Sequence, residues 1–175
     1  MKKFLTLCVA ALVAVTTVSA KDYKHSIGMV AGLGVGAQYK TMVADHFTII
    51  AEYGYFMNLD GGTANKYGFA SYSGAIANGV FAFQTSPLAE GQGIKLSLYA
   101  GGQMKIGYAN IGIDAGVFGV GAAAGIEANM TNAPIAFSFD FRPGYAMVFG
   151  DPWNGVVDLS HMFDYSFNLG VRYTF

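Results

Sequence analysis

Charged side chains occur in this sequence at alternate positions of strongly apolar segments. In the segment 135–145, Asp140 and Arg142 alternate with phenylalanines, and Arg172 alternates with apolar residues near the end of the chain. Alternate residues of a strand lie on one face, so these charges lie opposite the apolar side chains. Carboxylates, guanidinium groups and amines on one face can form ion pairs or a polar path. The residues with this pattern are Lys40, Glu52, Lys95, Lys105, Glu127, Asp140, Arg142 and Arg172.

Two roles are open for this charged face once it is enclosed. One is a path for protons, ions or small solutes, and the other is a sealed network of ion pairs. We expect the sealed network, because a buried charge must be paired in either case. In that arrangement Arg142 and Arg172, on adjacent strands, share the carboxylates of three residues, namely Asp140, Glu127 and Glu52.

A nucleophilic triad has one local candidate, formed by Asp158, Ser160 and His161. Such a triad would suit a lipid A-modifying hydrolase. Adjacent residues of an extended segment point in opposite directions, however, so Ser160 and His161 are poorly placed as nucleophile and base. The other histidines, His25 and His46, lie too far apart in sequence for metal-ligand spacing. We therefore expect no catalytic residue and no metal.

Two glycine-rich segments, 32–37 and 119–124, match the pattern G-x-G-x-x-A. A dinucleotide site needs this motif to open a helix inside a βαβ unit. Here the flanking residues alternate with period two, which indicates strands. Glycine that keeps a strongly bent strand free of bulk explains both segments better, so we expect no cofactor.

The first 20 residues resemble an export signal. Lys2 and Lys3 precede an apolar segment, 4–15, and small residues end the signal at Ala20. We expect a signal peptide at 1–20 and one domain at 21–175. A retained membrane anchor is the alternative. A lipoprotein signal at Cys8 fits poorly, because the residue before it is not small.

Composition sets the class of fold. The chain has 175 residues, of which 53% are hydrophobic and 12% are charged. After removal of the signal, no run of 18 apolar residues remains that could span a bilayer as a helix. The formal charge of −1 and the lack of a basic run argue against nucleic-acid binding. A membrane-like composition without a membrane helix predicts a closed β-barrel.

The alternation decides which face of the barrel meets lipid. Residues 164–175 alternate between apolar and polar side chains without a break, and 94–106 repeat the pattern. A soluble barrel would place the apolar face inside. An eight-stranded barrel is too narrow for six bulky groups per strand, so we expect the apolar face outside, against lipid.

We expect an all-β fold: an eight-stranded antiparallel transmembrane β-barrel with up-and-down meander topology. The first two strands are short, so a single strand over 26–41 is the alternative. The facing of 69–84 is open, because Phe81 and Phe83 compete with Val80 and Ala82 for lipid. Short periplasmic turns are expected near 44–46, 86–93 and 130–133. The expected outer connections are a tight hairpin through 32–34 and the longer segments 58–68, 109–116 and 148–163. The predicted strands are 26–31, 35–41, 47–57, 69–84, 94–108, 118–129, 135–147 and 164–175.

The end of the chain resembles the C-terminal signal of outer-membrane proteins, with an aromatic last residue and apolar residues at alternate positions before it. The residues that carry this pattern are Leu169, Val171, Tyr173 and Phe175. With Asp140-Phe141-Arg142-Pro143-Gly144, they make the chain similar to the small eight-stranded barrels typical of Bacteroidota, a group distantly like OmpX and the membrane domain of OmpA. The resemblance implies a bacterial outer-membrane location and recognition by the barrel assembly machinery during insertion.

We therefore expect an integral outer-membrane protein without enzymatic activity, with a structural or surface-contact role and a lumen filled by side chains. A narrow channel for ions or small solutes is the first alternative, and a lipid A-modifying hydrolase is the second. Outer-membrane lipid and the assembly machinery are the expected partners, with no nucleic acid. The sequence indicates no particular protein partner.

Overall fold

The computed structural model describes residues 23–59, 71–110, 114–150 and 159–175. Within these ranges no helix is long and apolar enough to cross a membrane. The same ranges contain nine strands: β1 (His25–Gly32), β2 (Gly34–Ala44), β3 (Phe47–Leu59), β4 (Ser71–Gln84), β5 (Ala89–Gly91), β6 (Ile94–Asn110), β7 (Asp114–Met130), β8 (Ile135–Phe149) and β9 (Leu159–Thr174).

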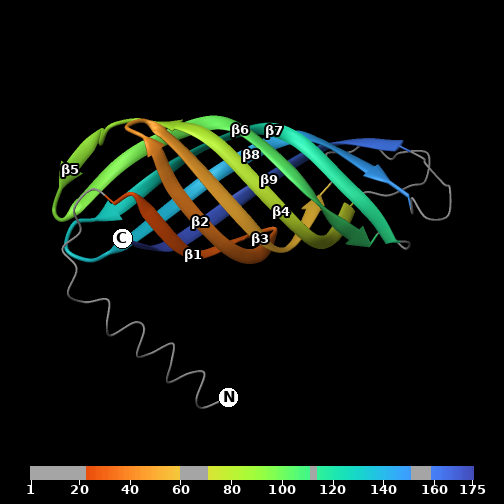
Figure 1. Cartoon of the computed structure of the whole chain (residues 1–175), viewed down its shortest axis with the longest axis horizontal. Helices are drawn as coiled ribbons and strands as arrows, with labels where there is room; N and C mark the ends of the chain where they lie inside the picture. Colours follow the sequence, from red (N-terminus) through yellow and green to blue (C-terminus); the bar gives the residue numbers. More distant parts are fainter. Residues whose placement is uncertain (1–22, 60–70, 111–113, 151–158) are drawn as a thin grey trace, which may run out of the picture.

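Eight of these strands, all except β5, form a closed barrel (Figure 1). Each pairs antiparallel with its neighbours along the chain, and the pairing of β1 with β9 closes the cylinder. Ser26 lies opposite Thr174, so the first strand begins and the last strand ends at the same rim. The expected fold class, an eight-stranded antiparallel transmembrane barrel with up-and-down topology, is confirmed.

The first two strands are separate, as predicted. Gly32 pairs with Gly34 across the single residue Leu33, which makes a very tight hairpin. β2 continues to Ala44, beyond the predicted end at residue 41, because its pairing with β3 continues through a bulge at Met42 and Ala44.

Several strands extend into regions where we predicted outer connections. β6 and β7 have 17 residues each and stay paired up to Asn110 and Asp114, and β9 begins at Leu159 rather than at residue 164. Backbone pairing thus continues where the apolar alternation has faded. A strand of that length spans about 55 Å at roughly 3.3 Å per residue, well beyond the 9–11 residues that a bilayer requires. The barrel wall is therefore longer than one bilayer crossing needs, and the extra length lies at the end away from the start of β1 and the end of β9.

The region 86–93, predicted as a simple turn, contains the short strand β5. Ala89–Gly91 pairs with Ile94–Leu96 at the start of β6. The two linking residues, Gln92 and Gly93, have φ angles of 50° and 83°, as a type I′ hairpin turn requires. Glycine suits the second position because it adopts positive φ without strain.

The outer surface of the barrel is apolar. The facing of β4 is now settled: Phe81 and Phe83 point outward with 54% and 48% of their surface exposed, whereas Val80 and Ala82 are 1% exposed. On β8 and β9, outward aromatic rings stack along the surface, with centroids 4.8 Å apart for Phe141 and Phe167. An exposed apolar surface of this extent fits a lipid environment.

A pair of leucine substitutions tests this arrangement. Leu169 in β9 and Leu88 in the turn before β5 are similarly exposed, at 61% and 63%, but lie at different heights on the barrel. Leu169→Arg should cost roughly 2–4 kcal/mol, because it places a charge near the bilayer midplane, and Leu88→Arg about 0–1 kcal/mol at the rim. Urea unfolding in lipid vesicles measures the free energy of unfolding of both variants. Equal losses of stability would contradict the placement of Leu169 near the bilayer midplane and Leu88 at the rim.

Candidate functional site in the barrel lumen

The interior of the barrel contains two linked layers of charged and polar side chains. The layer nearer the start of β1 and the end of β9 is centred on Glu127, whose carboxylate is fully buried. Lys40 Nζ lies 2.7 Å from Glu127 Oε2, and Arg172 pairs with the same oxygen. Tyr23 and Gln84 donate hydrogen bonds to Oε1. We call these five residues the Glu127 cluster.

The second layer is centred on Arg142. Its guanidinium group donates two hydrogen bonds to Glu52, of 2.6 and 2.8 Å, and one of 2.9 Å to Asp140 Oδ2. The Tyr99 hydroxyl donates to Asp140 Oδ2 at 2.6 Å, and the Asn168 amide donates to Oδ1 at 2.9 Å. We call these five residues the Arg142 cluster. Each carboxylate in it accepts at least two hydrogen bonds, as buried carboxylates require.

Gln38 connects the two clusters. Its Nε2 donates to Glu52 Oε1 at 2.5 Å, and its Oε1 accepts a hydrogen bond from Arg172. The absence of a side chain at Gly170 makes room for this contact, because a Cβ there would lie 2.5 Å from Ser138 Oγ and 2.9 Å from Gln38 Oε1. The clusters therefore form one hydrogen-bonded network across the lumen.

The buried charges of the described interior balance. A further ion pair joins Lys105 to Asp164, so four cations face four carboxylates. The Glu127 cluster carries two cations and one carboxylate, and the Arg142 cluster carries one cation and two carboxylates. Neither cluster is neutral by itself, and neutrality arises only when both are present. This long-range compensation stabilises charges that would be costly to bury alone.

The end of the lumen away from the start of β1 and the end of β9 is apolar, which we did not predict. Val30, Phe56, Ile76, Val117 and Val148 point inward there and are buried together with three alanines. Between this apolar cap and the Arg142 cluster lies a cavity of about 20 Å³, bordered by Phe56, Ile76, Arg142 and Asp164. A cavity of that size holds roughly one water molecule. Side chains therefore fill the described lumen from the Glu127 cluster to the cap.

The structure brings together most of the charged residues singled out in the sequence. The two arginines bind the three predicted carboxylates but divide them, so that no carboxylate binds both: Arg142 binds Glu52 and Asp140, while Arg172 binds Glu127. The prediction that Lys95 points into the barrel holds only in part. Lys95 lies at the rim, 28% exposed at its side chain, and its amine is 3.4 Å from Glu90 Oε1.

Several network residues were missed because they are uncharged or lie outside a strand. Gln38 and Gln84 carry no charge to attract notice, although their alternation with inward residues would have identified them. Tyr23 precedes β1, so no apolar–polar alternation around it indicated an inward side chain. Burial raises the pKa of the Tyr23 phenol and the Glu127 carboxylate raises it further, so the hydroxyl remains a hydrogen-bond donor.

The triad candidate gains no support. Asp158 lies outside the described residues, and Ser160 and His161 occupy neighbouring positions of β9, opposite Val148 and Met147. Neighbouring positions of one strand belong to opposite faces of a sheet. In the described ranges, no three His, Cys, Asp or Glu side chains lie close enough together to hold a metal ion.

Three residues of the proposed assembly signal lie on β9, the strand that closes the barrel, and Phe175 directly follows it. Leu169, Val171 and Phe175 point outward and are exposed, and Tyr173 is half-buried. β9 pairs with β1 on one side and with β8 on the other.

No protein-family model matches the chain, and no curated protein matches it. Among solved structures, it is similar to the crystal structure of Neisserial surface protein A (NspA), with 12% sequence identity and a TM-score of 0.41. The similar region covers 86% of this chain and 93% of that protein. The likeness is distant, and none of the site assignments depends on it.

Charge compensation between the clusters can be tested by a double-mutant cycle. Arg172→Met should destabilise the barrel by about 3–5 kcal/mol, because it leaves an excess carboxylate buried. Adding Glu52→Gln should restore at least about 1 kcal/mol, although Glu52 belongs to the other cluster, because Lys40–Glu127 and Arg142–Asp140 then balance.

Urea unfolding in detergent micelles, followed by circular dichroism, measures each variant. Lys40→Met combined with Arg172→Met is the matched control, and it should be worse than Arg172→Met because both cations that bind Glu127 are lost. Strictly additive losses for Arg172→Met and Glu52→Gln would contradict charge compensation between the clusters.

Proposed function

We propose that this chain is an integral protein of the bacterial outer membrane, exported by a signal peptide at 1–20. Its barrel acts as a closed scaffold that holds the outer connections at the cell surface, in a structural or surface-contact role. The apolar exterior supports placement in a membrane, since bacterial barrels of this architecture present an outward apolar band to lipid.

The observation that carries the proposal is the sealed, neutral lumen. Arg142 and Arg172 are 2% and 1% exposed, so water does not reach them in the described structure. The apolar cap lies beyond them, toward the outer end. An ion would have to separate buried ion pairs and then cross this cap, which favours a scaffold over a channel.

The same lumen supports a non-enzymatic role. Its carboxylates and cations are engaged with one another, and Asp140 and Glu127 also accept hydrogen bonds from tyrosine. A catalytic acid, base or nucleophile needs access to substrate. In the described lumen these groups are buried and held in the network instead.

The proposed location implies two partners, outer-membrane lipid and the barrel assembly machinery that recognises the C-terminal residues. The outward side chains of Leu169, Val171 and Phe175 support both roles, since lipid and an assembly factor would each contact the outer face of β9. The proposal includes no nucleic acid and no cofactor.

Planar-bilayer recordings distinguish the scaffold from the channel. The folded barrel, inserted from detergent, should give no stepwise currents, because the ion-paired layers and the apolar cap block the lumen. Insertion is checked on vesicles prepared in parallel, by flotation and by the β-sheet circular dichroism signal. Stepwise ion currents from the inserted protein would contradict the scaffold role.

Cysteine labelling tests location and orientation. The only cysteine, Cys8, lies in the predicted signal, so introduced thiols would be unique. In intact cells, a membrane-impermeant maleimide should label Asp114→Cys at the outer β6–β7 connection but not Asp45→Cys at the turn between β2 and β3. Both should react after the outer membrane is permeabilised. Labelling of Asp45→Cys alone in intact cells would show that the protein has the opposite orientation and would contradict the proposed one.

A further inference from the structure

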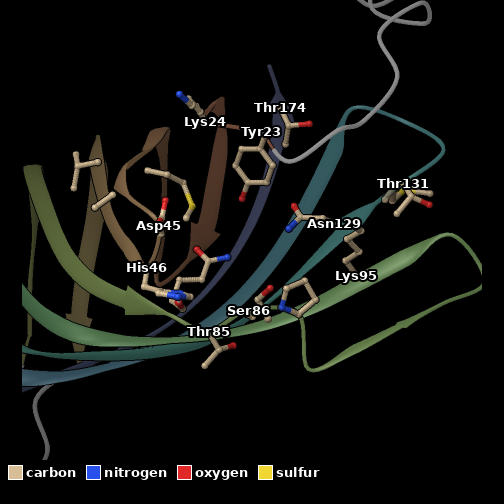
Figure 2. Close-up of a pocket in the computed structure, with 17 residues that line it drawn as sticks. Tyr23, Lys24, Asp45, His46, Thr85, Ser86, Lys95, Asn129, Thr131 and Thr174 are labelled. Atoms are coloured by element: carbon tan, nitrogen blue, oxygen red, sulfur yellow. The ribbon is translucent and has the colours of Figure 1, made fainter.

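The rim where β1 begins and β9 ends contains an open cavity of about 570 Å³, which we call the vestibule (Figure 2). It lies between the turn after β2, the end of β4 and the facing ends of β6 and β7. Short turns mark this rim, so the proposed membrane orientation places it on the periplasmic side. The volume falls within the range of about 300–1,000 Å³ for small-molecule sites.

Uncharged polar residues are the most numerous class in the vestibule wall, beside the apolar residues Met42, Val43, Ala44, Pro87 and Met130. Eight of its residues carry a hydroxyl or a side-chain amide, and such groups can both donate and accept hydrogen bonds. Tyr23 and His46 add ring surfaces. Figure 2 shows the Tyr23 ring and the Asn129 amide pointing toward the middle of the hollow. This wall suits a ligand rich in hydroxyl and amide groups.

One polar group of this wall has no partner among the described residues. The hydroxyl-bearing residues Ser97 and Thr174 also border the vestibule, and each is only 4% exposed. Asn129 Nδ2 donates to Glu127 Oε1 at 3.2 Å, while Asn129 Oδ1 has no donor. An unpaired polar atom at a partly enclosed wall is costly, and a ligand that donates a hydrogen bond to it relieves that cost.

The charges at the vestibule do not favour an ionic ligand. Lys24 extends away from the hollow in Figure 2, and Lys95 is engaged by Glu90. Asp45 and His46 lie together at the other side of the rim, and His46 Nδ1 is 3.1 Å from the backbone oxygen of Gln84. Neither a cluster of cations for a phosphate nor a cluster of carboxylates for a cation is present among these residues.

We propose that the vestibule binds an uncharged amide-bearing sugar, one or two N-acetylated amino-sugar units in size. Sugar hydroxyls pair with Ser97 and Thr174, the acetamido N–H donates to Asn129 Oδ1 after a small rotation of that side chain, and a sugar ring packs against Tyr23. The periplasmic orientation rests on the proposed function, whereas the binding site rests on the cavity itself.

Ligand-observed NMR on the folded barrel in detergent micelles tests the site, with N,N′-diacetylchitobiose as the probe. Two small-to-large variants at the same rim separate the vestibule from the surrounding surface. Ala44 is exposed and borders the vestibule, whereas Ala89 in β5 is exposed but does not border it. Neither belongs to the ion-paired network, so both Trp variants should fold, which circular dichroism verifies.

Saturable binding is expected for the unchanged barrel and for Ala89→Trp, and binding at least about tenfold weaker is expected for Ala44→Trp. Cellobiose, which lacks the acetamido groups, should bind more weakly than the probe. Absence of saturable binding, equal affinity of the two variants, equal affinity for cellobiose, or preference for a trialanine peptide would overturn the assignment. A barrel that conducts ions yet binds the probe contradicts only the scaffold role.

Discussion

The narrowness of an eight-stranded cylinder controls the rest of this structure. Alternate side chains point into a bore that has room for side chains and little else, so every inward group must both fit and find a partner. The charged groups meet this requirement as four cations and four carboxylates, and the charges of the Glu127 and Arg142 clusters cancel only when both clusters are present. Glycines at the crowded positions, such as Gly170 beside Gln38 and Ser138, leave the space that the long charged side chains occupy.

Paired charges fill one part of the lumen, and apolar side chains close its other end. The Glu127 cluster, with Tyr23 over it, lies toward the rim where β1 begins and β9 ends, and the apolar cap around Phe56 and Val148 lies at the other end. The cap follows from strand length, since strands that continue past the bilayer require an interior there as well. Apolar side chains fill that interior without adding charges that would need partners.

Much of the fold could be predicted from the sequence because period-two alternation is clear over residues 135–142 of β8 and 164–174 of β9, where Phe139 and Leu169 alternate with Asp140 and Asn168. Which side chains of β4 face outward could not be predicted, because Phe81 and Val80 are both apolar. Only the closure of the barrel decides that Phe81 points outward and Val80 inward. The inward position of the charged residues could be predicted from their alternation with apolar residues. Their ion-pair partners could not, because partners 90 residues apart, such as Glu52 and Arg142, are brought together by the strand register around the cylinder.

Hydrogen exchange of the arginine side chains tests the sealed, mutually paired lumen most directly. In selectively labelled protein folded in lipid bicelles, the guanidinium protons of Arg142 and Arg172 should exchange with deuterated water as slowly as the backbone amides of the central strands. They should also show restricted rotation of the guanidinium groups, because their hydrogen bonds fix those groups. Exchange as fast as that of a solvent-exposed arginine would show that water fills the bore and would contradict the account.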